Sequence, residues 1–211
     1  MANVMAGLGQ LLGQLQYVPQ HLVHVGAHEG QEMPYYRAVG IPQVTLVEPI
    51  PALAARLRAE HPDATVVECA CGPGPGREQL HVMQRTNLST LAAPRRGDQV
   101  AEVLDVEVRR LDDIAPTADA AVIDAQGLEL EVLSAAPWES LRLVVVETCT
   151  VDDPTMASPY DAVVGAVTAR RFAEVERWVR DYDWLNRWAR GRGQPRRGGE
   201  VRDVVFYRGA R

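Results

Sequence analysis

The sequence predicts an α/β fold in which a mostly parallel sheet carries helices on both faces. Short apolar runs, typical of buried strands, alternate along the chain with segments whose apolar residues recur at helical spacing. This alternation is the pattern of βαβ units, and neither an internal repeat nor a linker interrupts it. With 211 residues, of which 46% are hydrophobic, the chain can bury one substantial core. We therefore expect an N-terminal helix over residues 1–18 and one doubly wound domain over residues 19–211.

The expected elements follow one another in a regular order. Val4, Leu8, Leu11, Leu12 and Leu15 are spaced as on one face of an amphipathic helix. Strands are then expected near residues 21–27, 43–48, 65–69, 79–83, 103–108, 121–124, 141–147, 172–179 and 201–207, and helices near 31–39, 51–60, 128–136 and 160–170. Pro51 suits the first turn of the helix it begins. No obvious helix separates the last two strands, so we expect the final one to insert antiparallel.

The N-terminal helix needs a partner for its apolar face. The predicted sheet already has helices for both of its faces. We therefore expect this helix either to cover a ligand crevice or to pack in a homodimer.

Composition narrows the classes of function. A formal net charge of -6 disfavours nucleic-acid and membrane-surface partners, because both select a basic surface. The three cysteines include no CxxC pair and have no spaced histidine partners, which disfavours zinc and fits reduced thiols in a cytoplasmic protein. Residues 1–17 lack the pattern of a signal peptide, and no apolar run approaches the roughly 20 residues that span a bilayer. We expect a cytoplasmic protein without a membrane partner.

Four apolar runs stop at glycine or ionisable residues. The run from residue 21 ends at Gly26-Ala27-His28-Glu29-Gly30, and the others end at Glu48-Pro49, at Asp124 and at Glu147. In an open α/β sheet, ligands bind outside the carboxyl ends of the strands where the strand order reverses. The four endings therefore predict one site, of the kind that binds a nucleotide-like cofactor.

The first of these turns favours a cofactor without a pyrophosphate. Gly26 would let the backbone approach a ligand, and Gly30 would let the next helix pack closely. Ala27 and His28 stand where a GxGxxG turn has its middle glycine, which weakens the case for an NAD-linked oxidoreductase. Glu48 follows Gly26 by 22 residues, close to the spacing at which an acid binds both ribose hydroxyls. The alternative is that Glu48 caps the following helix.

Five segments together resemble one family, the FkbM methyltransferases. They are HVGAHEGQE (24–32), LVEP (46–49), LDD (111–113), IDAQGLELEVL (123–133) and VE (146–147), and the resemblance runs from about residue 21 to residue 207. It implies a class I fold with a seven-stranded sheet whose last strand is antiparallel. It also implies S-adenosylmethionine (SAM) as the cofactor and a small-molecule or sugar hydroxyl as the usual acceptor.

The resemblance also implies roles for individual residues. The cofactor contacts that we expect are Gly26, Ala27, His28, Gly30, Glu32, Glu48, Pro49, Cys69, Ala70 and Asp124. The acceptor contacts that we expect are Asn87, Ser89, Glu129 and Tyr160. His24 replaces the acid that many members direct at the methionine end of SAM, and Glu29 or Glu32 could take its place. Cys149 replaces a more common polar amide.

Transfer to a hydroxyl needs a base at the methyl end of the site. His28 and Asp124 follow what we expect to be adjacent central strands, so they are the natural pair, and Glu147 would face the same crevice. Their alternative roles are ordinary ones, a packing histidine and a turn-capping aspartate. Asp124, Glu129 and Glu147 could together hold a hard divalent cation, but no dedicated spacing supports one and we predict no metal.

A last segment combines aromatic and basic residues. Trp178, Tyr182, Trp184 and Trp188 lie among Arg187, Arg190, Arg192, Arg196 and Arg197, and could form a lid over an anionic or sugar-like substrate. An exposed hairpin is the alternative. The leading hypothesis is thus a SAM-dependent O-methyltransferase. The two alternatives are an NAD-linked oxidoreductase and a non-catalytic binding subunit of the same fold.

Overall fold

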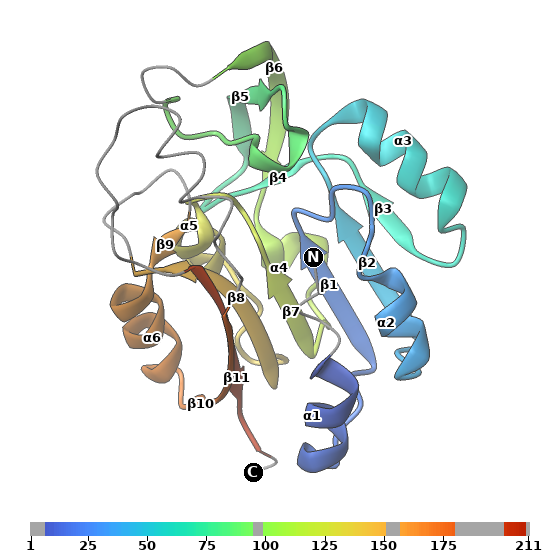
Figure 1. Cartoon of the computed structure of the whole chain (residues 1–211), viewed down its shortest axis with the longest axis vertical. Helices are drawn as coiled ribbons and strands as arrows, with labels where there is room; N and C mark the ends of the chain where they lie inside the picture. The colour runs from blue at the N-terminus through green and yellow to red at the C-terminus, as the bar shows by residue number, and fades with distance from the viewer. Residues whose placement is uncertain (1–6, 95–98, 151–156, 180–200, 210–211) are drawn as a thin grey trace.

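The computed structural model describes residues 7–94, 99–150, 157–179 and 201–209. A central sheet has the strand order β10-β11-β8-β7-β1-β2-β3, and a short β9 pairs with β8 (Figure 1). The strands are β1 (His21–Val25), β2 (Gln43–Val47), β3 (Thr65–Val67), β7 (Ala120–Ile123), β8 (Leu143–Cys149), β9 (Ser158–Pro159), β10 (Ala173–Val179) and β11 (Val201–Tyr207). In this sheet only β11 runs antiparallel to its neighbours, β8 and β10, which confirms the orientation predicted from the sequence.

Helices cover both faces of this sheet. One face packs on α4 (Leu111–Ile114), α5 (Glu129–Ser134) and α6 (Tyr160–Thr168), and the other on α1 (Leu8–Leu15), α2 (Met33–Ala38) and α3 (Pro51–Glu60). Because successive strand residues point to opposite faces, Val23 of β1 belongs to the first core and Leu22 to the second. The strands are buried on both sides, which is why they read as continuous apolar runs. Within the described ranges, no helix combines the length and the apolar character needed to cross a bilayer.

The N-terminal helix packs against its own domain, which neither role expected for it had foreseen. Leu8, Leu11 and Leu12 of α1 are buried in the second core, which also contains Leu22 and Leu143, the residues near the starts of β1 and β8. Helix α1 therefore lies toward the amino ends of the strands, away from the crevice (Figure 1). The error came from supposing that α2 and α3 suffice to cover that face. With its apolar side buried in its own chain, α1 no longer provides an argument for a homodimer.

A second, smaller sheet follows β3. It has the order β4-β6-β5 and contains β4 (Ala70–Cys71), β5 (Gly76–Met83) and β6 (Val100–Arg109). The strands near 79–83 and 103–108 were predicted, but their departure from the central sheet was not. The expected strand over 65–69 ends at Val67, and Ala70 pairs instead with Val108 of β6. A short 3-10 turn, η2 (Thr86–Leu88), continues from β5.

Candidate active site

The turn after β1 depends on Gly26. Its φ is +80°, and the amides of Gly26 and Ala27 both donate to the carbonyl of Val47, at 3.0 and 3.1 Å. A Cβ at position 26 would lie 1.9 Å from the carbonyl oxygen of Asp124. Glycine is therefore required here by the close approach of β7, whereas the sequence suggested the approach of a ligand.

Gly30 ends the same turn with a φ of +70°. A Cβ there would lie 2.7 Å from Nε2 of His61 and 2.8 Å from Leu57. Close packing of a helix was predicted at this glycine. The helix that packs there is α3, whereas the prediction concerned the next helix in the chain, α2.

Glu48 ties this turn to the start of α3. It is 4% exposed, and its two oxygens accept from the amides of His28 and Ile50, each at 2.9 Å. Since Ile50 is the N-cap residue of α3, Glu48 does order that helix start, the alternative role weighed above. Burial raises the pKa of its carboxyl, and the two amides oppose the rise. Each carboxylate oxygen has a second lone pair, so a diol can still be bound.

His28 holds an unusual position in the turn. Its φ is +48°, a left-handed conformation that non-glycine residues adopt only when their surroundings hold them there. Nε2 lies 2.7 Å from the hydroxyl of Thr86, whereas Nδ1 is sealed from solvent with no hydrogen-bond partner among the described residues. Burial lowers the pKa of the imidazole, and the nearby Glu29 and Asp124 only partly offset this. The ring is thus neutral at pH 7.

Asp124 and Glu147 meet through Gln126. As predicted, β1 and β7 are neighbours, so Asp124 lies beside the turn that carries His28. The side-chain amide of Gln126 donates to Asp124 at 2.5 Å and to Glu147 at 3.1 Å. Gln126 has a φ of +48° and was missed as a site residue, although it stands inside the segment that carries the family resemblance.

Glu129 of α5 orders the loop after β7 through its buried carboxylate. The side chain is 0% exposed, and its oxygens accept from the amides of Ala125, Gly127 and Ser158 at 3.1, 3.0 and 2.6 Å. Burial raises the pKa of this carboxyl, and the hydrogen bonds oppose the rise. Its expected contact with an acceptor stays a prediction.

Asp124, Glu129 and Glu147 each offer one oxygen within 4.8 Å of the others. A hard cation could use such a set of oxygens. Gln126 and three backbone amides already donate to these carboxylates. Our prediction of no metal remains a prediction.

His24 stands where we expect many family members to carry an acid for the methionine end of SAM. His24 is buried, and its Nδ1 lies 3.1 Å from the hydroxyl of Tyr36 on α2. Glu29 is held outward by Arg56 of α3, at 2.8 Å. Glu32 lies at the start of α2, close enough for its charge to contribute to the shifted pKa values of His28 and Tyr36. Of the two acids, Glu32 therefore stays our candidate for the methionine end of SAM.

Two residues expected near the acceptor lie on the segment after β5. Asn87 is exposed on η2, whereas the hydroxyl of Ser89 accepts from the amide of Met83 at 3.1 Å. The neighbouring Thr90 is buried and donates to the carbonyl of Gln126 at 2.9 Å. The small sheet thus extends this polar segment over the loop after β7.

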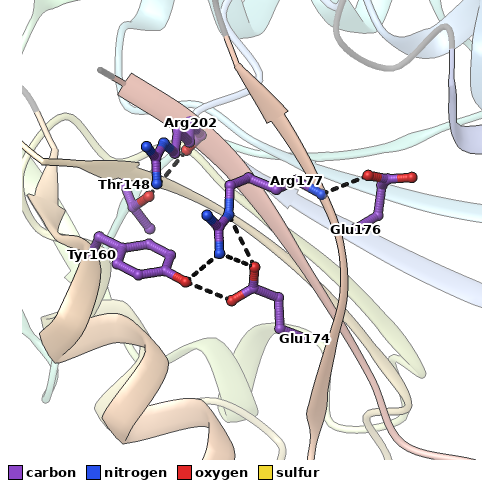
Figure 2. Close-up of polar contacts among 6 residues, drawn as sticks. All are labelled: Thr148, Tyr160, Glu174, Glu176, Arg177 and Arg202. Atoms are coloured by element: carbon purple, nitrogen blue, oxygen red, sulfur yellow. Dashed lines mark hydrogen bonds and ion pairs between the residues drawn. The ribbon is translucent and has the colours of Figure 1, made fainter. Parts of the chain in front are cut away.

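Tyr160 belongs to a separate polar cluster, shown in Figure 2. Its hydroxyl donates to Glu174 at 2.8 Å and accepts from Arg177 at 2.5 Å. The guanidinium groups of Arg177 and Arg202 lie 4.7 and 5.6 Å from the centre of its ring. The structure thus fixes Tyr160 by contacts with β10 and β11, and its contact with an acceptor is untested.

The other predicted cofactor contacts lie beyond β2 and β3. Pro49 lines a small pocket with Glu68 and Asp105. Cys69 and Ala70 are buried, and burial raises the pKa of the Cys69 thiol to about 11, so this cysteine is not a reactive thiolate.

Cys149 lies at the carboxyl end of β8. Cys149 packs with Ala157 and Val201 in a small apolar cluster. Of the lid residues only Trp178 is described, and it packs against the second core. The remaining lid residues lie outside the described ranges, so the lid stays a prediction.

Comparison with known proteins identifies the family. Residues 24–183 match the family described as the methyltransferase FkbM domain. Among curated proteins, none matches this sequence.

Solved structures of methyltransferases share the fold. The N-methyltransferase NodS from Bradyrhizobium japonicum shares 12% sequence identity with a TM-score of 0.51, covering 98% of this chain and 97% of its own. The N-terminal domain of EvdMO1, crystallised with S-adenosylhomocysteine and D-fucose, shares 9% identity with a TM-score of 0.52, covering 99% and 84%. Identities this low show the fold alone, and that fold is the class I methyltransferase fold expected from the sequence. Because the family match spans most of the chain, this protein belongs to the FkbM family of SAM-dependent methyltransferases.

Proposed function

We propose that this enzyme transfers the methyl group of SAM to a hydroxyl of a small molecule. The observation that carries the proposal is the pair at the carboxyl edge formed by the neutral imidazole of His28 and the half-buried Asp124. A hydroxyl must lose its proton during transfer, and a neutral imidazole is the side chain best suited to take it near pH 7. The fold alone does not decide between oxygen and nitrogen acceptors, so the choice rests on this base.

The residues at the carboxyl edge fit SAM. Glu48 would accept from the ribose hydroxyls with the lone pairs that the amides of His28 and Ile50 leave available. The turn from Gly26 to Gly30 and Glu32 would hold the methionine part, while Pro49, Cys69 and Ala70 would flank the adenine, the two buried residues through their backbone. When bound, SAM supplies a methyl group on an already activated sulfonium, so the protein mainly aligns the acceptor and excludes water.

The acidic residues would organise the acceptor side. Asp124 would favour the protonated imidazole that forms when His28 takes the proton. Gln126 holds Asp124 and Glu147 at a fixed separation, so Glu147 could orient the acceptor. The net charge of -6 supports a small-molecule acceptor over a nucleic acid or a membrane surface.

Titration calorimetry with SAM, S-adenosylhomocysteine and NAD tests the cofactor site. We expect micromolar binding of the first two and none of NAD. Glu48→Gln should weaken SAM binding by about 1.5–3 kcal/mol, the scale of hydrogen bonds to a charged group. Asp63→Asn is the matched control, because Asp63 is an exposed acid paired with Arg37, and it should bind SAM like the wild type. Binding of NAD without SAM would refute the proposal.

A further inference from the structure

Thr86 lies on η2, far in sequence from the turn that carries His28, yet its hydroxyl is 2.7 Å from Nε2 of the imidazole. Nothing in the sequence marked this threonine. The other ring nitrogen, Nδ1, is sealed from solvent and has no partner within the described residues. The two nitrogens of one ring therefore have very different surroundings.

This asymmetry selects one tautomer of the neutral ring. A hydroxyl can either donate to Nε2 or accept from it. If Thr86 donated, the ring proton would be on Nδ1, as a buried N–H with no acceptor. If Thr86 accepts, Nδ1 keeps only a lone pair without a partner. An orphaned buried donor is the rarer and costlier of the two states.

The small sheet fixes Thr86 independently of His28. The backbones of His81 and Thr90 pair through two hydrogen bonds of 2.9 and 3.2 Å on either side of η2. The Ser89 hydroxyl accepts from the amide of Met83, and the Thr90 hydroxyl donates to the carbonyl of Gln126. The segment that carries Thr86 is thus held at both ends by contacts that do not involve His28.

We propose that Thr86 is a positioning residue, which accepts a hydrogen bond from Nε2–H of His28 and so fixes the ring, in one neutral tautomer, beside Asp124. This rests on the proposed function.

The charged groups that act on this ring come from its own turn and from three neighbouring elements. Glu29 on the turn, Asp124 after β7 and Glu32 at α2 favour the protonated ring, whereas Arg56 of α3 opposes it. These charges set how readily the ring is protonated. The tautomer of the neutral ring depends on the two local hydrogen-bonding sites.

Long-range proton–nitrogen NMR spectra of protein labelled with nitrogen-15 at histidine report the tautomer directly, without an acceptor. For wild type near pH 7.5 we expect Nε2–H to exceed Nδ1–H at His28 by about tenfold or more, the scale of one unsatisfied buried donor. Thr86→Val should lower that ratio by about tenfold, and Thr86→Ser should restore it. Thr168→Val removes an exposed hydroxyl on α6 that does not contact this segment, and should leave the ratio within about twofold.

His21 is an internal reference, because its ring contacts Thr45 and Thr117 at the other end of β1. Unchanged His21 signals in Thr86→Val would show that this variant is folded. If these signals change, the tautomer of His28 is judged from the wild-type and Thr86→Ser spectra alone. A wild-type His28 with its proton on Nδ1, or a Thr86→Val ratio equal to that of wild type, would overturn the proposal. Calorimetry keeps the two ideas separate, since a protein that shows the expected tautomer but binds no SAM refutes the function and not the role of Thr86.

Discussion

Replacing Gly26 with alanine tests why this turn needs glycine. The new Cβ would lie 1.9 Å from the carbonyl oxygen of Asp124, whereas real contacts of this kind stay above 3.0 Å. The ends of β1 and β7 would therefore have to separate by at least about 1.1 Å. Such a shift breaks the hydrogen bond from the amide of Asp124 to the carbonyl of Val25, now 3.1 Å long.

The expected cost has three parts. A left-handed conformation costs a non-glycine residue roughly 1–2 kcal/mol. Losing the strand hydrogen bond costs about 0.5–1.5 kcal/mol. Displacing two packed strands adds a cost like that of overpacking a core, about 1–3 kcal/mol. Gly26→Ala should therefore lower the free energy of unfolding by about 2.5–6.5 kcal/mol.

Gly40→Ala is the matched control. Gly40 has the same φ of +80°, but a Cβ there would meet nothing within 4 Å. Only the conformational part remains, about 1–2 kcal/mol. Urea unfolding of both variants separates the two contributions, and if Gly26→Ala loses no more stability than Gly40→Ala, the approach of Asp124 is not what requires glycine.

The remaining predictions concern proton transfer, pH and helix α1. Asp124→Asn keeps the shape of the side chain, so SAM affinity should stay within a few-fold while turnover falls by about 10²–10⁴; unchanged turnover would exclude Asp124 from proton transfer. Burial lowers the pKa of His21 from 6.5, so below that pH the unfolded chain binds a proton that the folded ring does not. The stability due to neutral His21 is thus present above pH 6.5 and lost as the pH falls through the folded pKa. The difference in free energy of unfolding between wild type and His21→Gln should shrink on acidification. A difference that stays constant with pH would show that folding does not lower the pKa of His21. Leu12→Ala should cost about 2–5 kcal/mol and the half-buried Leu15→Ala clearly less, whereas equal losses would argue against the packing of α1.

The sequence by itself determined the main sheet and the edge that forms the site. Apolar periodicity is a local property, so the runs before Gly26, Glu48, Asp124 and Glu147 could be recognised as strands without knowing their partners. Parallel connection through helices then places all their carboxyl ends on one side. Glu48 and Asp124 were proposed in this way because each directly follows a strand, and His28 because it stands in the turn after one.

Only the tertiary structure decided which side chains meet at that edge. Thr86 contacts His28 across 58 residues, and Gln126 bridges to Glu147 across 21, so neither pair leaves a periodic signal in the sequence. The departure of β5 and β6 into a separate sheet likewise depends on strand pairing, which period-2 alternation cannot specify. The requirement for glycine at position 26 was visible from the sequence, but its cause was not. A close approach between two strands is a property of the packed backbone, and no single segment encodes it.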